Sequence, residues 1–168
     1  MSKMMAGVAL AAVMATSAHA EADESSKLVG VWKLTGYARH ETDTGKDIKF
    51  YGEHPTGFLI NTKGGHFVSS GFADQRTKPA AAVPTDDERI ALFKSMWAYE
   101  GTYKVDGGKI TQTIEDAWVQ GWLGGCLTLD KFEVSDKTLT VMTAPFKSAT
   151  PSGDSAEIIV TATYERVE

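Results

Sequence analysis

Hydrophobic and polar residues alternate along most of this chain, in short segments separated by turn-forming residues. Alternation with a period of two is typical of strands that bury one face and expose the other. Glycine-containing turns such as NTKGG and DGG join neighbouring segments, which favours antiparallel hairpins. The pattern predicts strands at residues 31–39, 56–61, 66–71, 99–105, 109–116, 126–134, 138–144 and 156–167.

One segment, PTDDERIALFKSMWAYEG, departs from this alternation and predicts a helix. Thr85 and Glu88 form a capping box, in which each side chain accepts a hydrogen bond from a backbone amide of the first turn. Apolar residues then follow at helical spacing, which predicts a helix that packs through one stripe. The stripe contains Ile90, Phe93, Met96 and Trp97.

These elements amount to about eight strands in hairpin order, with one helix inserted between the third and the fourth. We expect an all-β fold, an antiparallel up-and-down β-barrel, because closure removes the exposed edges of a sheet. A barrel of about eight strands holds one small ligand or is filled by its own side chains. The alternation leaves both alternatives open.

The first twenty residues have the organisation of a cleaved secretory signal. Lys3 precedes an apolar run at residues 4–15, and the A-x-A motif that ends at Ala20 supplies a cleavage site. The run is shorter than the roughly 20 residues that a membrane span needs. We therefore expect a periplasmic or secreted protein, with a mobile leader at 21–27 and one domain at 28–168.

Composition narrows the choice of partners and cofactors. The chain has 17 Lys and Arg against 22 Asp and Glu, a net charge of −5, and no basic stripe, so it lacks the electrostatic footing of a nucleic-acid-binding protein. The single cysteine, Cys126, cannot form an internal disulfide and is expected to be a buried small hydrophobe, with a reactive thiol as the alternative. His40, His54 and His66 have no metal-site spacing, and no phosphate-binding loop is present, so we expect no metal and no cofactor.

Several motifs occur in an order that resembles a known family. They are LVGVWKL with its G-x-W at Gly30 and Trp32, the YG-x-x-P-x-G turn before FLINTKGGHF, the segment YEGTYKV, and Trp122 with Gly124. Over residues 28–167 the chain is similar to the lipocalin-like domain family, the small stand-alone calycin-type barrels of bacteria and fungi. The resemblance implies that Trp32 closes the narrow end of the barrel and that Arg166 lies across its indole ring, where a cation–π attraction would hold it.

Strand alternation also predicts which side chains face the interior, although a shift of one residue would invert the set. An apolar and aromatic lining with a few polar groups is typical of a ligand pocket, and a packed core is the alternative. The predicted ligand-binding residues are Phe58, Ile60, Phe67, Tyr99, Tyr103, Gln112, Ile114, Val141 and Trp122.

A catalytic alternative would use His66, Glu115 and Asp116 as general acid and base. His66 follows a Gly-Gly turn and the two acids end a strand, so we expect all three to be exposed and assign no catalytic residue. Trp118 and Trp122 flank a glycine-rich segment that could form a lid, a cap or a contact patch.

The sequence therefore favours a secreted barrel that binds a small lipophilic molecule non-covalently, with Gln112 or a tyrosine hydroxyl fixing its orientation. One alternative is a barrel enzyme, an isomerase or cyclase that acts on a hydrophobic substrate. The other is an envelope interaction protein with a filled barrel.

Overall fold

The structure is a computed structural model that describes residues 25–147 and 156–168. The predicted signal and residues 21–24 of the leader lie outside the described residues. The barrel strands are β1 (Gly30–Glu41), β3 (Thr56–Asn61), β4 (His66–Phe72), β5 (Met96–Asp106), β6 (Lys109–Ala117), β7 (Cys126–Val134), β8 (Thr138–Thr143) and β10 (Glu157–Arg166). The remaining elements are β2 (Asp47–Ile48), helix α2 (Asp86–Lys94), the short 3₁₀ helix η1 (Gln120–Trp122) and β9 (Phe146–Lys147).

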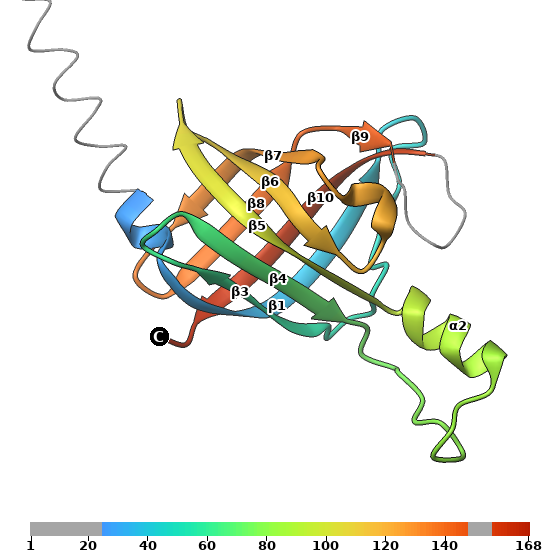
Figure 1. Cartoon of the computed structure of the whole chain (residues 1–168). Coiled ribbons are helices and arrows are strands. Elements are labelled where there is room, and N and C mark those ends of the chain that lie inside the picture. Colours follow the sequence, from blue (N-terminus) through green and yellow to red (C-terminus); the bar gives the residue numbers. More distant parts are fainter. Residues whose placement is uncertain (1–24, 148–155) are drawn as a thin grey trace, which may run out of the picture.

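The eight long strands close into an antiparallel barrel (Figure 1). Their order follows the chain, β1-β3-β4-β5-β6-β7-β8-β10, and β10 pairs with β1 to complete the ring. This confirms the predicted fold class and the place of the helix between the third and fourth barrel strands. The two-residue strands β2 and β9 pair with β1 and β10, respectively. Alternation did not predict them, because two residues are too few to show a period.

Trp32 fills the closed end of the barrel. Its side chain is fully buried, and its indole Nε1 donates a 2.8 Å hydrogen bond to the carbonyl of Leu28. The guanidinium carbon of Arg166 lies 4.0 Å from the centroid of the indole. Gly30 makes room for this packing, because a Cβ there would lie 2.6 Å from Arg166 Nη1, and its φ of +144° disfavours other residues. The arrangement is the one that the resemblance implies.

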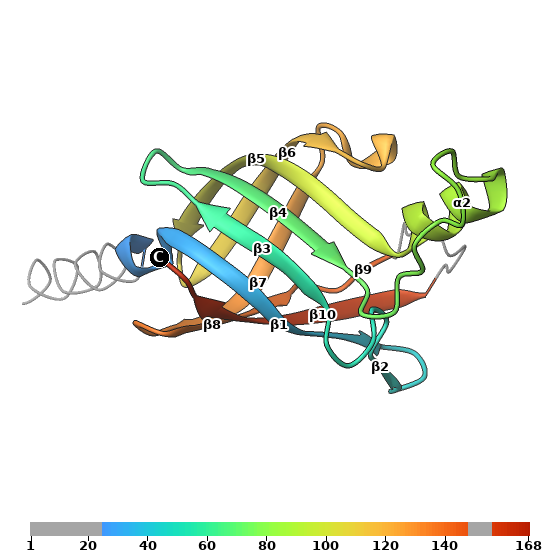
Figure 2. The same ribbon diagram turned by 90° about the horizontal axis from the view of Figure 1, so that it is seen from below.

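Arg166 also ties three segments together through backbone carbonyls. Its Nε donates to the carbonyl of Asp136, Nη1 to that of Val29 and Nη2 to that of Lys27, at 2.8, 2.8 and 2.5 Å. Residues 25–27, which we expected in the leader, form a helical turn with Leu28. The C-terminus lies at the same end of the barrel as this turn (Figures 1 and 2).

The helix is shorter and more exposed than its sequence predicts. The capping box is present, but α2 ends at Lys94, and Met96 and Trp97 begin β5. No residue of α2 is buried, and Ile90 and Phe93 are 52% and 43% exposed. The expected packing through an apolar stripe is therefore wrong. Its physical reason is that the Trp97 ring packs inside the barrel, while α2 stands outside it (Figure 2).

Cys126 is exposed, which corrects the expectation of a buried thiol. It pairs with Thr113 across β6 and β7, and Thr113 belongs to the outward-facing set of β6. Because residues directly opposite each other share a face of the sheet, Cys126 follows Thr113 outward.

Gly71 of β4 and the ring of Trp97 on the paired strand β5 approach each other closely. A Cβ at Gly71 would lie 2.0 Å from the Trp97 ring carbon Cη2. The ring cannot move away freely, because Trp97 Nε1 donates a 3.2 Å hydrogen bond to Ser69 Oγ. Glycine at 71 is therefore required by the close approach of an indole and not by its own backbone angles.

Replacing Arg166 with lysine tests the closed end. Lysine keeps the charge but loses the planar fork, so we expect Arg166→Lys to lower the free energy of unfolding by about 1–3 kcal/mol. Urea denaturation measures this change. The control is Arg89→Lys, since Arg89 pairs with Asp86 on an exposed helix, where a change within about 0.5 kcal/mol is expected. Equal losses in both variants would contradict the role given to Arg166.

Replacing Gly71 with alanine tests the indole contact. We expect Gly71→Ala to cost about 1–3 kcal/mol of stability, because the added methyl group overpacks a well-filled wall. The near-ultraviolet circular dichroism of tryptophan should change as the ring is displaced. Gly64→Ala, in an exposed turn with its nearest neighbour 3.7 Å away, should leave both quantities unchanged. An unaltered spectrum in Gly71→Ala would show that the ring is not held there.

Candidate binding cavity

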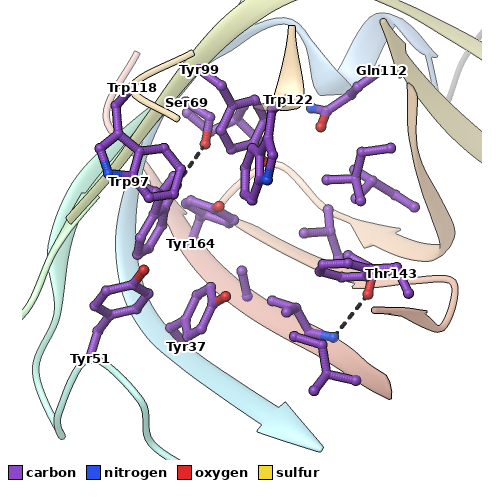
Figure 3. A pocket seen from close by; sticks show the side chains of 18 residues that line it. Tyr37, Tyr51, Ser69, Trp97, Tyr99, Gln112, Trp118, Trp122, Thr143 and Tyr164 are labelled. Atoms are coloured by element: carbon purple, nitrogen blue, oxygen red, sulfur yellow. Dashed lines mark hydrogen bonds between the residues drawn. The ribbon is translucent and has the colours of Figure 1, made fainter. Parts of the chain in front are cut away.

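The barrel contains an internal cavity of about 60 Å³. This volume accommodates a few water molecules. Its wall is mainly aromatic and aliphatic, and Figure 3 shows the side chains that enclose it. The lining residues are Tyr37, Tyr51, Leu59, Ser69, Trp97, Tyr99, Gln112, Trp118, Trp122, Leu127, Leu129, Val141, Thr143, Phe146, Ile158, Val160, Ala162 and Tyr164.

Three rings form one side of the wall. Tyr37 and Tyr51 meet edge to face with their centroids 5.0 Å apart, and Trp97 lies 4.9 and 4.7 Å from them. Aromatic pairs at these separations gain attraction beyond the burial of their surface. The cluster therefore forms a preorganised aromatic surface.

A β-bulge places Tyr37 on this surface. The pairing of β1 with β10 shifts register between Leu34 and Gly36. Trp32 and Leu34 face inward before the bulge, and Tyr37 and Arg39 face inward after it. An extra residue in a strand reverses the alternation, so a phenol ring takes the place that Gly36 would otherwise occupy.

A second chain of rings partly covers the cavity at the end away from Trp32. We call residues 118–125 the capping segment. Trp122 contacts Tyr99 and Trp118 edge to face, at 5.5 and 5.0 Å. Trp118 in turn lies 6.0 Å from Phe93 of α2, and its Nε1 donates a 3.3 Å hydrogen bond to the Phe93 carbonyl. The capping segment is thus held between the cavity and the exposed helix.

Two of the polar groups in the wall have partners within the protein. Ser69 Oγ accepts the hydrogen bond from Trp97, and Thr143 Oγ1 accepts a 2.9 Å hydrogen bond from the backbone amide of Val160 (Figure 3). These hydroxyls help to fix the wall.

Other polar groups also face the cavity, and one of them, Gln112, has an oxygen without a partner among the described residues. Gln112 is 3% exposed, and its Oε1 is buried without a hydrogen bond. The hydroxyls of Tyr37, Tyr51 and Tyr164 lie around the same space, as Figure 3 shows. A ligand or water could pair with these atoms.

The cavity is electrically neutral at ordinary pH. Burial raises the pKa of Tyr51 to about 12, and Arg39 nearby opposes part of that rise. Burial also raises the pKa of Tyr37 and Tyr164 above the usual range of a phenol. The described lining residues include no Asp, Glu, Lys, Arg or His. The tyrosine hydroxyls therefore remain protonated, and each can donate or accept a hydrogen bond.

Arg39 supplies a positive charge close to Tyr37 and Tyr51. Its side chain is fully buried in β1, and its guanidinium carbon lies 4.7 Å from the centroid of Phe50. Phe50 contacts Tyr51 edge to face at 5.0 Å. The charge thus lies behind the cavity wall and not among the lining residues.

The structure brings together four of the predicted ligand-binding residues: Tyr99, Gln112, Trp122 and Val141 line the cavity. Phe67, Tyr103 and Ile114 are buried but lie outside its lining. The hydroxyl of Tyr103 donates to the Thr62 carbonyl at 3.1 Å and so serves the adjacent turn.

Phe58 and Ile60 face outward, 44% and 38% exposed, which corrects their assignment to the interior. Leu59 and Asn61 take the inward positions of β3. The segment FLI is apolar on both faces, so alternation alone could not choose between them. The hydrogen bond from Asn61 Nδ2 to the Leu28 carbonyl, beneath Trp32, belongs to the inward register.

Sequence reasoning missed Tyr37, Tyr51 and Trp97. The bulge in β1 reverses the alternation before Tyr37, so the pattern placed its side chain on the wrong face. Tyr51 belongs to a turn, where no alternation indicates which side chains face the interior. Trp97 fitted the helical spacing of Ile90 and Phe93. The aromatic content of the YG-x-x-P-x-G turn was the available signal for Tyr51.

The candidates for acid–base chemistry lie elsewhere. His66, Glu115 and Asp116 are exposed, and none of them lines the cavity. Within the described part of the chain, no group of three His, Cys, Asp or Glu is placed to hold a metal ion. Residues 25–147 and 156–168 contain no helix that is both long and apolar enough to cross a membrane.

Comparison with known proteins identifies the family. A family model described as a lipocalin-like domain matches residues 29–167. Among solved structures, the chain is similar to a lipocalin-like protein from Bacteroides uniformis, at 17% sequence identity and a TM-score of 0.39 over 83% of this chain and 97% of that one. None of the curated proteins compared matches it. Since the family model spans most of the sequence, the chain belongs to the lipocalin-like domain family.

Proposed function

We propose that this protein binds a small, flat, apolar molecule inside its barrel. The observation that carries the proposal is the cavity itself, a partly enclosed space walled by aromatic rings with a few uncharged polar groups. Such a lining is typical of sites that hold small molecules by burial of apolar surface. The organisation of residues 1–20 supports a location in the periplasm or outside the cell.

The cavity must enlarge before such a molecule can enter. Its volume of about 60 Å³ is smaller than the ~150 Å³ of an engineered cavity that binds benzene. One of the wall residues therefore has to move. We propose that ligand entry displaces the ring of Trp122.

The surroundings of Trp122 support this role. It is half-buried, at the end of η1, and its ring contacts are with Tyr99 and Trp118. Backbone hydrogen bonds of Trp118, Gly124 and Gly125 join the capping segment to β5 and β6. Its side chains are less constrained, because no residue of η1 is buried and a Cβ added at Gly121 or Gly124 would meet no atom within 4 Å. Segments with few buried contacts open at low free-energy cost. Trp122 would then act as a gate that fills the site in the absence of ligand.

The expected affinity is modest. Burying ~200 Å² of apolar ligand surface at about 25 cal/mol per Å² contributes roughly 5 kcal/mol, and aromatic contacts add to this while the loss of ligand motion opposes it. We expect dissociation constants of ~1–100 μM for molecules of two fused rings.

The alternatives have less support. An isomerase or cyclase that uses acid–base chemistry would need titratable groups facing the substrate, and His66, Glu115 and Asp116 are exposed outside the cavity. A contact patch at the capping segment would need exposed tryptophans, and both Trp118 and Trp122 are half-buried in the cavity wall.

Isothermal titration calorimetry with naphthalenes, retinoids and fatty acids tests the binding function. We expect saturable binding of at least one aromatic class at one site per chain. Trp122→Ala should bind the same aromatic molecule about 3- to 10-fold more tightly and more rapidly, because the cost of displacing the ring disappears.

Leu123→Ala is the matched control, since Leu123 is a half-exposed neighbour in the capping segment. It should leave affinity and association rate unchanged. Absence of saturable binding in both the wild type and Trp122→Ala would refute the binding function. Weaker binding in Trp122→Ala would refute the gate, since the ring would then be part of the bound site.

A further inference from the structure

Gln112 is the polar side chain that the barrel interior leaves unexplained. It belongs to β6, between the buried residues Ile110 and Ile114, and is itself 3% exposed. Its carboxamide lies in the cavity wall, and Figure 3 shows it directed toward the enclosed space. Oε1 has no hydrogen-bond partner among the described residues. Buried amide oxygens in folded proteins nearly always have a partner, because an unmade hydrogen bond is costly there.

The partner of Oε1 must be a hydrogen-bond donor. A carbonyl oxygen only accepts, whereas the hydroxyls of Tyr37, Tyr51 and Tyr164 can donate or accept and so tolerate either kind of ligand group. Ser69 and Thr143 already accept hydrogen bonds from the protein. Gln112 is therefore the group that discriminates between ligands.

The absence of charged groups among the described lining residues limits the charge that the donor group of the ligand can carry. A cationic donor would lose its hydration without gaining an anion, since the described lining residues carry no carboxylate. A carboxylate on the ligand would bring a second oxygen acceptor against Oε1 with no proton between them. An uncharged O–H or N–H satisfies both conditions.

We propose that the ligand is an aromatic molecule with an un-ionised donor group, a phenol-type hydroxyl in its simplest form, which hydrogen-bonds to Oε1 of Gln112. The aromatic part follows from the rings of Tyr37, Tyr51 and Trp97, which form one side of the wall. The inference rests on the proposed binding function and adds the chemical class of the ligand.

The test compares 2-naphthol with 2-methoxynaphthalene and 2-naphthoate at pH 7, by calorimetric titration of the full chain. Methylation removes the donor and keeps the ring system and the oxygen. We expect the wild type to prefer 2-naphthol over 2-methoxynaphthalene by about tenfold, the size of one buried hydrogen bond, and to bind 2-naphthoate most weakly.

Gln112→Leu should bring the affinity ratio of naphthol to methoxynaphthalene close to one, without weakening methoxynaphthalene. The control is Gln75→Leu, because Gln75 is exposed and outside the cavity lining, and this variant should keep the wild-type ratio. Thermal unfolding without ligand gives a second readout. Since Gln112→Leu removes an unpaired acceptor, its melting temperature should be unchanged or higher.

Four outcomes would overturn the inference. Equal binding of naphthol and methoxynaphthalene by the wild type would leave the barrel a binder without the proposed selectivity. A preference that survives in Gln112→Leu would assign the selectivity to another group. A marked fall in the melting temperature of Gln112→Leu would show that the amide has a structural partner. Binding of none of the naphthalenes, even by Trp122→Ala, would remove the proposed function together with the inference.

Discussion

The seal between Trp32 and Arg166 is the interaction on which the rest of the structure depends. A barrel can enclose a dry interior only if its first and last strands meet and its end is covered. Pairing of β1 with β10 meets the first condition, and the indole with its stacked guanidinium meets the second. Arg166 also binds the carbonyls of Val29 and Lys27. The end of β10 is therefore joined to the segment that precedes β1.

The two ends of the barrel are covered in different ways. Hydrogen bonds to backbone carbonyls fix the end at Trp32. The opposite end is covered by a chain of rings from Tyr99 through Trp122 and Trp118 to Phe93, on a helix that buries none of its own residues. For the proposed binding function, this difference would let the capping segment open while the strands of the wall keep their shape.

The interior of the barrel combines aromatic surface with neutral polar groups. Burial keeps the phenols of Tyr37, Tyr51 and Tyr164 protonated, so the cavity offers hydrogen bonds without fixed charge. Arg39 lies behind this wall and next to Phe50. The proposed gate connects the small volume of the cavity with the position of Trp122, because a ring that fills the site in the absence of ligand would avoid an empty apolar space.

The sequence by itself determined the barrel and its strand order, because period-two alternation and hairpin turns are local signals. The partners at the closed end came from the family resemblance that the G-x-W motif carries. It also identified Gln112, Tyr99, Val141 and Trp122. Only the tertiary structure decided the rest of the cavity. A bulge in β1 directs Tyr37 inward, and Trp97 packs on Gly71 inside the barrel and not on the helix. In the segment FLI, the register in which Asn61 faces inward and bonds to Leu28 places Leu59 inside and Phe58 and Ile60 outside. Each choice depends on contacts between residues distant in the chain, and alternation along one strand carries no information about such contacts.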